Sequence, residues 1–270
     1  MKLVPLQVWV IAKTVVDQDA LSAWISHCTK GCTNHVMKDR APTGQTLIEA
    51  AGRRCYNSFA PGINSNVQKV REDQGKYLKN IISVKHGSVL EHTSITFAVE
   101  GVSRVVTHEW VRHRVGVAFS QESMRFVAFE DVPIPLTDLT DEFFERSDKM
   151  LATVENVVSY LEKATSMLRD LAFKALGYSS AQDAPMSVRK AVTSWLRRWL
   201  PHGMATGMVF TANLRALRHL IPIRTAVGAE EEIRSLFNLV AKHCLREYPD
   251  VFYDFERKPD GSWVCEYEKV

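Results

Sequence analysis

One stretch of the chain, residues 108–126, concentrates charged groups within apolar sequence. It holds two histidines, three arginines, two carboxylates, two serines and one glutamine, interleaved with apolar side chains. Arg112, His113 and Arg114 are consecutive, so on regular secondary structure their side chains point in different directions. Guanidinium groups beside apolar surface need anionic partners, and phosphate fits their planar fork best. The stretch therefore predicts an anion-binding site, with internal salt bridges or a basic surface turn as the alternatives.

The same stretch resembles the signature of the flavin-dependent thymidylate synthases, the ThyX family. That signature is Arg-His-Arg, a short spacer and Ser-x-Arg-Tyr, and here Arg112-His113-Arg114 precedes Ser123-Met124-Arg125-Phe126. The sequence departs from the signature twice. The spacer has eight residues where the family usually has seven, and Phe126 replaces the terminal tyrosine.

Length and composition limit the class of protein. At 270 residues the chain can form one large domain, and 46% hydrophobic with 24% charged residues is ordinary for a soluble globular protein. The net charge of +3 is too small to argue for nucleic acid or a membrane surface. No apolar run approaches the roughly 18 residues of a membrane span. Five irregularly spaced cysteines show no disulfide framework, so we expect a cytoplasmic protein.

The hydrophobic periodicity predicts an α+β fold, mostly helical with a small central sheet, in a single domain over residues 1–270. Strands are expected at 8–14 and 92–99, and residues 59–66, 131–140 and 177–185 have the composition of loops. Helices are expected at 19–28, 45–54, 67–84, 102–110, 141–176, 186–200 and 230–248. An apolar run follows at 204–223, and a helix there would gather Arg215, Arg218 and His219 on one side.

Two groups of histidines raise the question of a metal. The cluster between His27 and His35 includes two cysteines, but its spacing fits no common zinc pattern and favours a polar loop. His86 and His92 are six residues apart, whereas metal pairs on one helix face are usually three or four apart. We therefore expect no metal site.

The second of these groups also resembles a family motif. Residues 86–92 match His-x-[Ser/Thr]-x-x-Glu-His, which in the family precedes Arg-His-Arg by about twenty residues. By that resemblance His86 lies near the flavin ring and the folate, and Ser88 and Glu91 contact flavin. The alternative is a loop whose polar side chains cap neighbouring helices.

A third segment resembles the family from Arg197 to Arg224 without a gap. It matches Arg-x-x-Leu-Pro and Asn-x-Arg-x-x-x-x-[Asn/His]-x-x-x-x-Arg. The resemblance implies that Arg197 and Arg224 bind the nucleotide, and that Asn213 and Arg215 bind flavin. On residue pattern alone, such a basic stripe is more often a solvated helix face. Gly228 stands where many members have a flavin-contacting histidine.

The resemblance, which is strongest over residues 45–250, implies a role for each candidate residue. The implied catalytic residues are Ser123, Arg224 and His86. The implied flavin-binding residues are Cys55, His86, Ser88, Glu91, Arg112, His113, Arg114, Gln121, Asn213 and Arg215. The implied substrate-binding residues are Glu109, Ser123, Arg125, Arg197 and Arg224. Cys55 adjoins two arginines but is interpreted as a packing or flavin-side residue, and Ser123 as a binding hydroxyl, because neither has a nucleophile's setting.

The activity implied by the resemblance is a methyl transfer. The family methylates C5 of dUMP to give dTMP, with 5,10-methylenetetrahydrofolate as carbon donor and NADPH-reduced FAD as hydride source. It works as a homotetramer whose subunits share active sites, so we expect small-molecule partners and no nucleic acid or membrane. A related pyrimidine-nucleotide C5 modifier, for instance a hydroxymethylating one, is the nearest alternative. A non-catalytic nucleic-acid-binding protein is a third, weakened by the low net charge.

Overall fold

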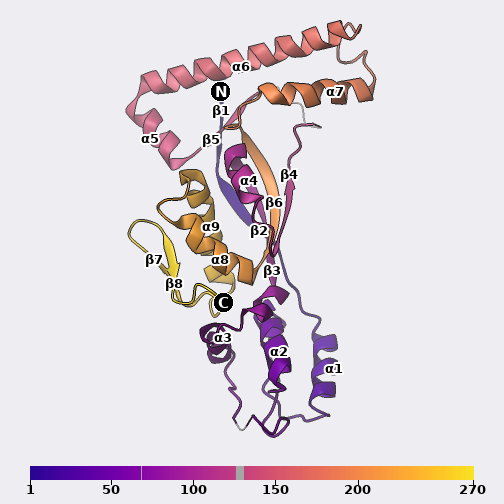
Figure 1. Cartoon of the computed structure of the whole chain (residues 1–270), viewed down its shortest axis with the longest axis vertical. Coiled ribbons are helices and arrows are strands. Elements are labelled where there is room, and N and C mark those ends of the chain that lie inside the picture. Colours follow the sequence, from indigo (N-terminus) through magenta and orange to yellow (C-terminus); the bar gives the residue numbers. More distant parts are fainter. Residues whose placement is uncertain (68, 126–130) are drawn as a thin grey trace. The chain divides into compact units, whose positions relative to one another are not determined.

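The structure, a computed structural model of the whole chain, describes residues 1–67, 69–125 and 131–270. Phe126 lies outside the described residues. The fold is α+β, with long helices and small sheets, as the periodicity predicts (Figure 1). The chain forms two compact units. Unit 1 comprises residues 1–9, 98–113 and 119–209, and unit 2 comprises residues 10–97, 114–118 and 210–270. The single-domain expectation stays a prediction.

A four-stranded sheet has the strand order β2-β3-β6-β4. Its strands are β2 (Gln7–Lys13), β3 (Ser94–Ser103), β6 (Ala205–Asn213) and β4 (Val117–Gln121). Four of the five boundaries between the units fall within these strands, and the fifth lies between His113 and Arg114. In the part belonging to unit 2, the rings of Phe97 and Phe210 stack at 4.9 Å between centroids, and both side chains are fully buried. This pair fixes the register of the neighbouring inner strands β3 and β6 through shape as well as hydrogen bonding.

Unit 1 contains four described α-helices, including the longest one. They are α4 (Arg104–Trp110), α5 (Asp138–Arg146), α6 (Asp148–Ala175) and α7 (Met186–Leu196), followed by the 3₁₀ helix η2 (Arg197–Trp199). Helices α6 and α7 run side by side, and buried Phe173 from α6 packs with Val192 and Leu196 from α7 (Figure 1). The sequence predicts one or two helices over 141–176, and the structure has two, because the Ser147 hydroxyl accepts from the amide of Met150 and starts α6 there.

Unit 2 contains the remaining helices. They are α1 (Gln18–Cys28), α2 (Gly44–Tyr56), α3 (Gln74–Ser83), the 3₁₀ helix η1 (Gly87–His92), α8 (Leu214–Thr225) and α9 (Glu231–Glu247). The antiparallel hairpin β7 (Phe255–Arg257) and β8 (Trp263–Cys265) follows α9. Helix α1 ends at Cys28, and turns follow it, as expected for a polar loop between His27 and His35.

Three predictions of secondary structure are wrong. Residues 131–140 contain strand β5 (Pro133–Leu136), which pairs in parallel with β1 (Lys2–Pro5); its prolines are tolerated because the sheet has only two strands and both are edges. The run 204–223, for which a helix was considered, divides into strand β6 and helix α8, since a largely apolar segment does not distinguish a buried strand from a helix. The helix expected over 67–84 begins only at Gln74, where the Asp73 carboxylate accepts from the amide of Lys76.

A buried ion pair explains why the described residues directly before Gln74 are not helical. The side chains of Glu49 and Arg53 are both fully buried on α2 and meet at 2.6 Å. Arg53 also donates to the carbonyls of Ser58, at 3.0 Å, and Arg71, at 2.6 Å, so it holds both ends of the segment between α2 and α3. These carbonyls bond to a guanidinium and not to a helical amide.

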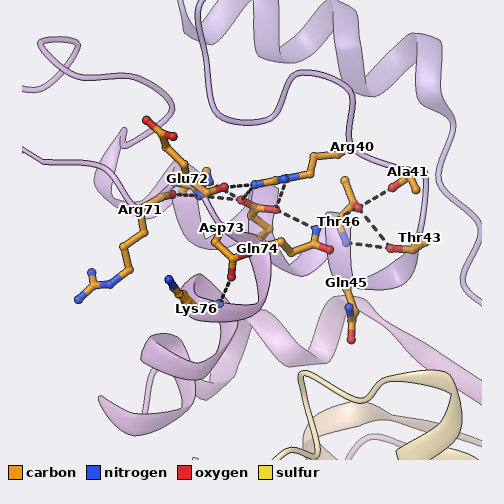
Figure 2. A network of polar contacts seen from close by, with 12 residues as sticks. Arg40, Ala41, Thr43, Gln45, Thr46, Arg71, Glu72, Asp73, Gln74 and Lys76 are labelled. Carbon is orange, nitrogen blue, oxygen red and sulfur yellow. Dashed lines mark hydrogen bonds and ion pairs between the residues drawn. The ribbon is translucent and has the colours of Figure 1, made fainter.

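Two further residues donate hydrogen bonds to the Glu49 carboxylate. Gln74 donates to the Glu49 carboxylate at 2.8 Å and to the Thr46 hydroxyl at 3.2 Å. Arg40 donates to the same carboxylate at 3.1 Å and to the carbonyl of Glu72. Figure 2 shows Arg40 directed toward the residues that precede α3, with Gln74 and Thr46 turned toward one another. The charge of Glu49 is thus compensated within unit 2.

We expect Glu49→Gln to destabilise the protein by about 3–5 kcal/mol, because it leaves the buried Arg53 guanidinium without its counter-charge. The free energy of unfolding in urea measures this. Glu142→Gln is the matched control, since it removes another i,i+4 partner, of Arg146, at 2.7 Å but on side chains that are 47% and 75% exposed. The control should change stability by less than about 1 kcal/mol. If both substitutions lower the free energy of unfolding equally, burial of the Glu49–Arg53 pair does not increase its contribution to stability.

Candidate functional site

Unit 1 contains a polar pocket of about 510 Å³. It is lined by Arg104, Thr107, His108, Val111, Gln121, Glu122, Ser123, Met124, Arg197, Arg198 and His202. These residues come from α4, the end of β4 and the segment after it, and the region around η2. Three arginines with hydroxyl and amide groups around one cavity suit an anionic ligand that also has hydrogen-bonding edges.

Local hydrogen bonds hold two walls of this pocket. The Ser103 hydroxyl accepts from the amide of Val106 and starts α4, while the amide of Arg104 donates to the carbonyl of Met204 at 3.2 Å. The amide side chain of Gln121 donates to the Thr107 hydroxyl at 2.8 Å and so links β4 to α4. The elements that carry the pocket-lining residues, α4 and β4 among them, are therefore joined to one another by hydrogen bonds.

The structure brings only some of the predicted site residues into this pocket. Ser123 and Arg197, both expected to bind the nucleotide, line it together, and Gln121, expected to bind flavin, lines it beside them. Arg125 follows with an exposed side chain and is not among the lining residues, and neither is Glu109, which is half-buried on α4.

Six polar residues of the pocket had no predicted role, namely Arg104, Thr107, His108, Glu122, Arg198 and His202. One signal was available for Arg104, because it is the only charged residue in the run from Gly101 to Thr107. An isolated arginine in an apolar run predicts either a buried ion pair or an anion ligand.

The consecutive residues Arg112, His113 and Arg114 have different surroundings. A guanidinium nitrogen of Arg112 lies 3.5 Å from the ring nitrogen of His108, and the ring of His113 lies 5.6 Å from that of Trp110. Arg114 has an exposed side chain and belongs to unit 2.

A second group of predicted residues gathers in unit 2 around η1. His86 precedes η1, and its ring meets the ring of Tyr56 edge-on at 5.6 Å. Tyr56 ends α2, directly after Cys55, whose thiol is exposed. The Nδ1 atom of His86 is buried, and the described residues offer it no hydrogen-bond partner. A buried imidazole nitrogen without a partner is a position where a ligand can supply one.

Helix α8 brings a further predicted residue to the same 3₁₀ helix. Arg215 forms an ion pair at 2.5 Å with Glu91 of η1, and it also donates to the carbonyl of Val270 at 2.8 Å. Both side chains of the ion pair are nearly half exposed. The guanidinium therefore remains accessible for a polyanionic ligand, and Ser88 lies on the same 3₁₀ helix with an exposed side chain.

The basic stripe expected on α8 is not one solvated face. Arg218 is 3% exposed and forms a bidentate pair with Asp254 at 2.7 and 2.8 Å. Both terminal nitrogens of its guanidinium are thus bound within the protein, whereas its buried Nε atom has no hydrogen-bond partner among the described residues. Arg224 is half-buried in the last turn of α8.

Asn213 has a structural part in addition to its expected flavin contact. Its side chain accepts from the amide of Ala216 at 2.8 Å and starts α8. A Cβ on Gly116, which has a φ of +71°, would lie 2.5 Å from the Asn213 amide nitrogen. Gly116 is therefore required both by its backbone conformation and by the close approach of this helix cap.

No cluster of three or more metal-binding side chains occurs within residues 1–67, 69–125 and 131–270. Across the same residues, no helix has the length and apolar character needed to cross a bilayer.

Substitution of Gly116 by alanine should displace Asn213 and loosen the start of α8. We expect a loss of about 2–4 kcal/mol, the sum of left-handed strain and a lost helix cap. Gly177→Ala is the control, because Gly177 also has a positive φ of +84° but nothing lies within 4 Å of the added Cβ. It should lose only the strain of about 1–2 kcal/mol. Urea unfolding compares the two, and equal losses would show that the Asn213 contact is unimportant.

The sequence matches the family described as thymidylate synthase complementing protein over residues 36–250. The chain is 33% identical to the flavin-dependent thymidylate synthase of Mycobacteroides abscessus, over 98% of this chain and 96% of that protein. It is 34% identical to the flavin-dependent thymidylate synthase of Corynebacterium diphtheriae, over 82% of this chain and 84% of that protein.

Solved structures share the fold. The UMP/dUMP methylase PolB from Streptomyces cacaoi, bound with 5-Br UMP, aligns with a TM-score of 0.57 and 15% identity over 93% of this chain and 94% of that chain. Thymidylate synthase X from Helicobacter pylori, with FAD and dUMP, aligns with a TM-score of 0.51 and 17% identity over 91% and 99%. These likenesses support the fold, and the sequence relationships above show that the chain belongs to the flavin-dependent thymidylate synthase family.

Proposed function

We propose that the protein is an FAD-dependent methyltransferase that converts dUMP to dTMP. It uses 5,10-methylenetetrahydrofolate as carbon donor, and NADPH reduces the flavin. The observation that carries the proposal is the pocket of unit 1, where Ser123 and Arg197, both family-motif residues, line one cavity with two further arginines. Membership of the family indicates which reaction is catalysed. The pocket offers the cationic and hydrogen-bonding groups that a nucleotide requires.

The residues around η1 fit a flavin dinucleotide. Arg215 offers a half-exposed guanidinium, and the buried Nδ1 atom of His86 lacks a partner within the described part of the chain. Ser88 adds a hydroxyl on the same 3₁₀ helix. The guanidinium of Arg215 suits a pyrophosphate. The Nδ1 atom of His86 suits the polar edge of an isoalloxazine ring or of a folate. Bound and reduced FAD would supply the hydride for the reaction.

The chain's own residues bind and orient the substrate. Guanidinium groups of the pocket neutralise the nucleotide phosphate, and the Ser123 hydroxyl hydrogen-bonds to it or to the base. Gln121 donates through its side-chain nitrogen to Thr107, and its side-chain oxygen is the acceptor for the pyrimidine edge. Orientation of C5 toward the flavin is the main contribution that such contacts make to the rate.

Product analysis tests the activity directly. Purified protein should be yellow and should convert dUMP to dTMP in the presence of 5,10-methylenetetrahydrofolate and NADPH, with the product identified by mass spectrometry. A hydroxymethylated product would replace the proposal with the related C5 modification. Colourless protein that binds nucleic acid would overturn the enzymatic proposal altogether.

We also propose that Arg125, Arg197 and Arg224 act on the nucleotide, and that Arg112, Arg114 and Arg215 act on flavin. Arg224→Ala should then keep its flavin but weaken dUMP binding by roughly 1.5–3 kcal/mol, or about 10- to 150-fold. Arg224→Lys should recover only part of this, because lysine lacks the bidentate fork. A dUMP titration that follows the bound-flavin spectrum decides, and loss of flavin from Arg224→Ala would contradict the division.

Assembly into a homotetramer belongs to the same proposal. Helix α6 leaves several large apolar side chains exposed along its length, namely Met150, Val157, Tyr160, Met167 and Leu171. Beside them lies an apolar groove of about 470 Å³ between α6 and α7, lined in part by Leu168, Leu171 and Trp195. Apolar surface of this extent is characteristic of an interface between proteins. A reducing, cytoplasmic location is also proposed, consistent with five free thiols.

Light scattering should give a mass of four chains of 30.6 kDa for the wild type. Leu171→Glu places a charge on the exposed apolar surface and should lower both the mass and the activity, because the family shares active sites among subunits. Lys163→Glu, an exposed charge change on the same helix, is the control and should leave the assembly intact. An active wild-type monomer at micromolar concentration would refute the assembly.

A further inference from the structure

We propose that residues 268–270, called the strap below, compete with an anionic ligand for Arg215 and so limit flavin binding. The inference rests on the proposed function, because the anion concerned is the pyrophosphate of the dinucleotide proposed to bind around η1. It starts from one hydrogen bond, in which the Nε atom of Arg215 donates to the backbone carbonyl of Val270 at 2.8 Å. The strap thus holds the side chain that the pyrophosphate needs.

A buried ion pair fixes the root of the strap. The amide of Tyr267 donates to the Asp254 carboxylate at 3.1 Å, and the Tyr267 carbonyl accepts from Arg218 at 3.1 Å. Arg218 and Asp254 are paired with each other at 2.7 Å, and both side chains are almost fully buried. Arg218 lies three residues after Arg215 on α8, so the two side chains leave the helix on one side. The same helix therefore holds the root and the far end of the strap.

The far end of the strap packs closely on η1. Val270 is half-buried, whereas the two residues before it are exposed. Gly87, the first residue of η1, is buried, and the three atoms nearest to a Cβ added there would all belong to Val270, with its backbone close enough to collide. Most of the buried surface of the strap is thus at Val270. The strap can detach without disturbing its root.

The strap and Glu91 together engage both edges of the Arg215 guanidinium. A guanidinium holds an anion bidentately through its Nε–Nη2 edge or its Nη1–Nη2 edge. The carbonyl of Val270 takes Nε, and the carboxylate of Glu91 takes Nη1 at 2.5 Å. Each edge therefore includes a nitrogen that is already bonded. Release of the strap makes the Nε–Nη2 edge available to a pyrophosphate and leaves the ion pair with Glu91 in place.

The size of the effect follows from how often the strap is seated. A ligand that binds only the open state has its affinity reduced by the open fraction. A strap seated in about nine molecules of ten lowers the affinity about 10-fold, which is the effect of one hydrogen bond to a charged group. Removal of residues 268–270 takes away one glutamate and one lysine, so the formal charge near Arg215 does not change.

Two variants release the strap by different means. One is a chain that ends at Tyr267, and the other is Gly87→Ala, whose added methyl group displaces Val270. Both should bind FAD, followed by flavin fluorescence, and inorganic pyrophosphate, followed by calorimetry, about 10-fold more tightly than the wild type. Combining them should give no further gain, because both act through the strap. The gain in pyrophosphate affinity should vanish when Arg215→Gln is added.

Gly203→Ala is the control. Gly203 has no positive φ, and nothing lies within 4 Å of a Cβ added to it. This variant should bind FAD and pyrophosphate as the wild type does.

A second measurement uses the wild-type strap and does not depend on the reaction. In protein labelled on valine methyl groups, the NMR signals of Val270, identified by their loss in Val270→Ala, should move to the position of an unstructured valine when FAD or inorganic pyrophosphate is added. If wild-type protein leaves dUMP unchanged, the proposed function fails, yet the response to pyrophosphate still decides the role of the strap.

The inference is overturned if the Val270 signals stay in place with both ligands. It is also overturned if a folded strap-releasing variant binds pyrophosphate no more tightly than the wild type. Weaker binding of FAD by both variants would mark residues 268–270 as a lid that retains the ligand, and would equally contradict competition.

Discussion

The buried carboxylate of Glu49 organises the described part of unit 2 between residues 40 and 77. It pairs with Arg53 on its own helix, and Arg40 and Gln74 reach it from two other segments. A charge with no exposure is tolerated only when its hydrogen-bonding capacity is nearly filled, so these three segments must assemble together. The ring of Tyr77 completes the site by covering the Arg53 guanidinium at 4.1 Å, and burial raises the pKa of this phenol to about 12.

This constraint extends to the candidate flavin residues. Arg53 fixes the carbonyl of Ser58, which lies just beyond the end of α2, and Asn57 adopts a left-handed conformation to make the turn. The last turn of α2 presents Cys55 and Tyr56, and the Tyr56 ring meets His86. The surroundings of His86 therefore depend on a fully buried ion pair within α2. The arginines of the described residues differ in their partners: Arg53 and Arg218 form buried ion pairs with carboxylates, whereas Arg104, Arg197 and Arg198 line the pocket of unit 1.

Much of the fold could be predicted because periodicity reports burial directly. Helices α1, α2, α9 and strand β2 follow their hydrophobic patterns to within one or two residues. The failures have physical causes. Strand β6 is an inner strand with a continuous apolar run, and the segment before α3 is held by guanidinium groups from elsewhere in the chain. Strand β5 needs β1 as a partner, and no local pattern can indicate a pairing across more than a hundred residues.

Residues of the candidate site could be predicted only where they belong to a family motif. Ser123 and Arg197 were found through the family resemblance, and the structure places them in one pocket. Arg104 and His202 have no motif, and their relevance appears only when the pocket lining is known. Pattern reasoning also grouped Arg215 with Arg218, but the partner of Arg218, Asp254, is far along the sequence, so its burial could not be foreseen.

A motif residue can be required by folding as well as by ligand chemistry, and Asn213 illustrates this. Its side chain caps α8, and two residues later the same helix presents Arg215 to Glu91. Gly116, two residues after Arg114, gives the cap the space it needs. The Asn-x-Arg pattern therefore has a geometric meaning. The asparagine sets where the helix begins, and the helix start sets the direction of the arginine. The spacing between the two residues is then fixed by the helix cap, whatever ligand the arginine binds.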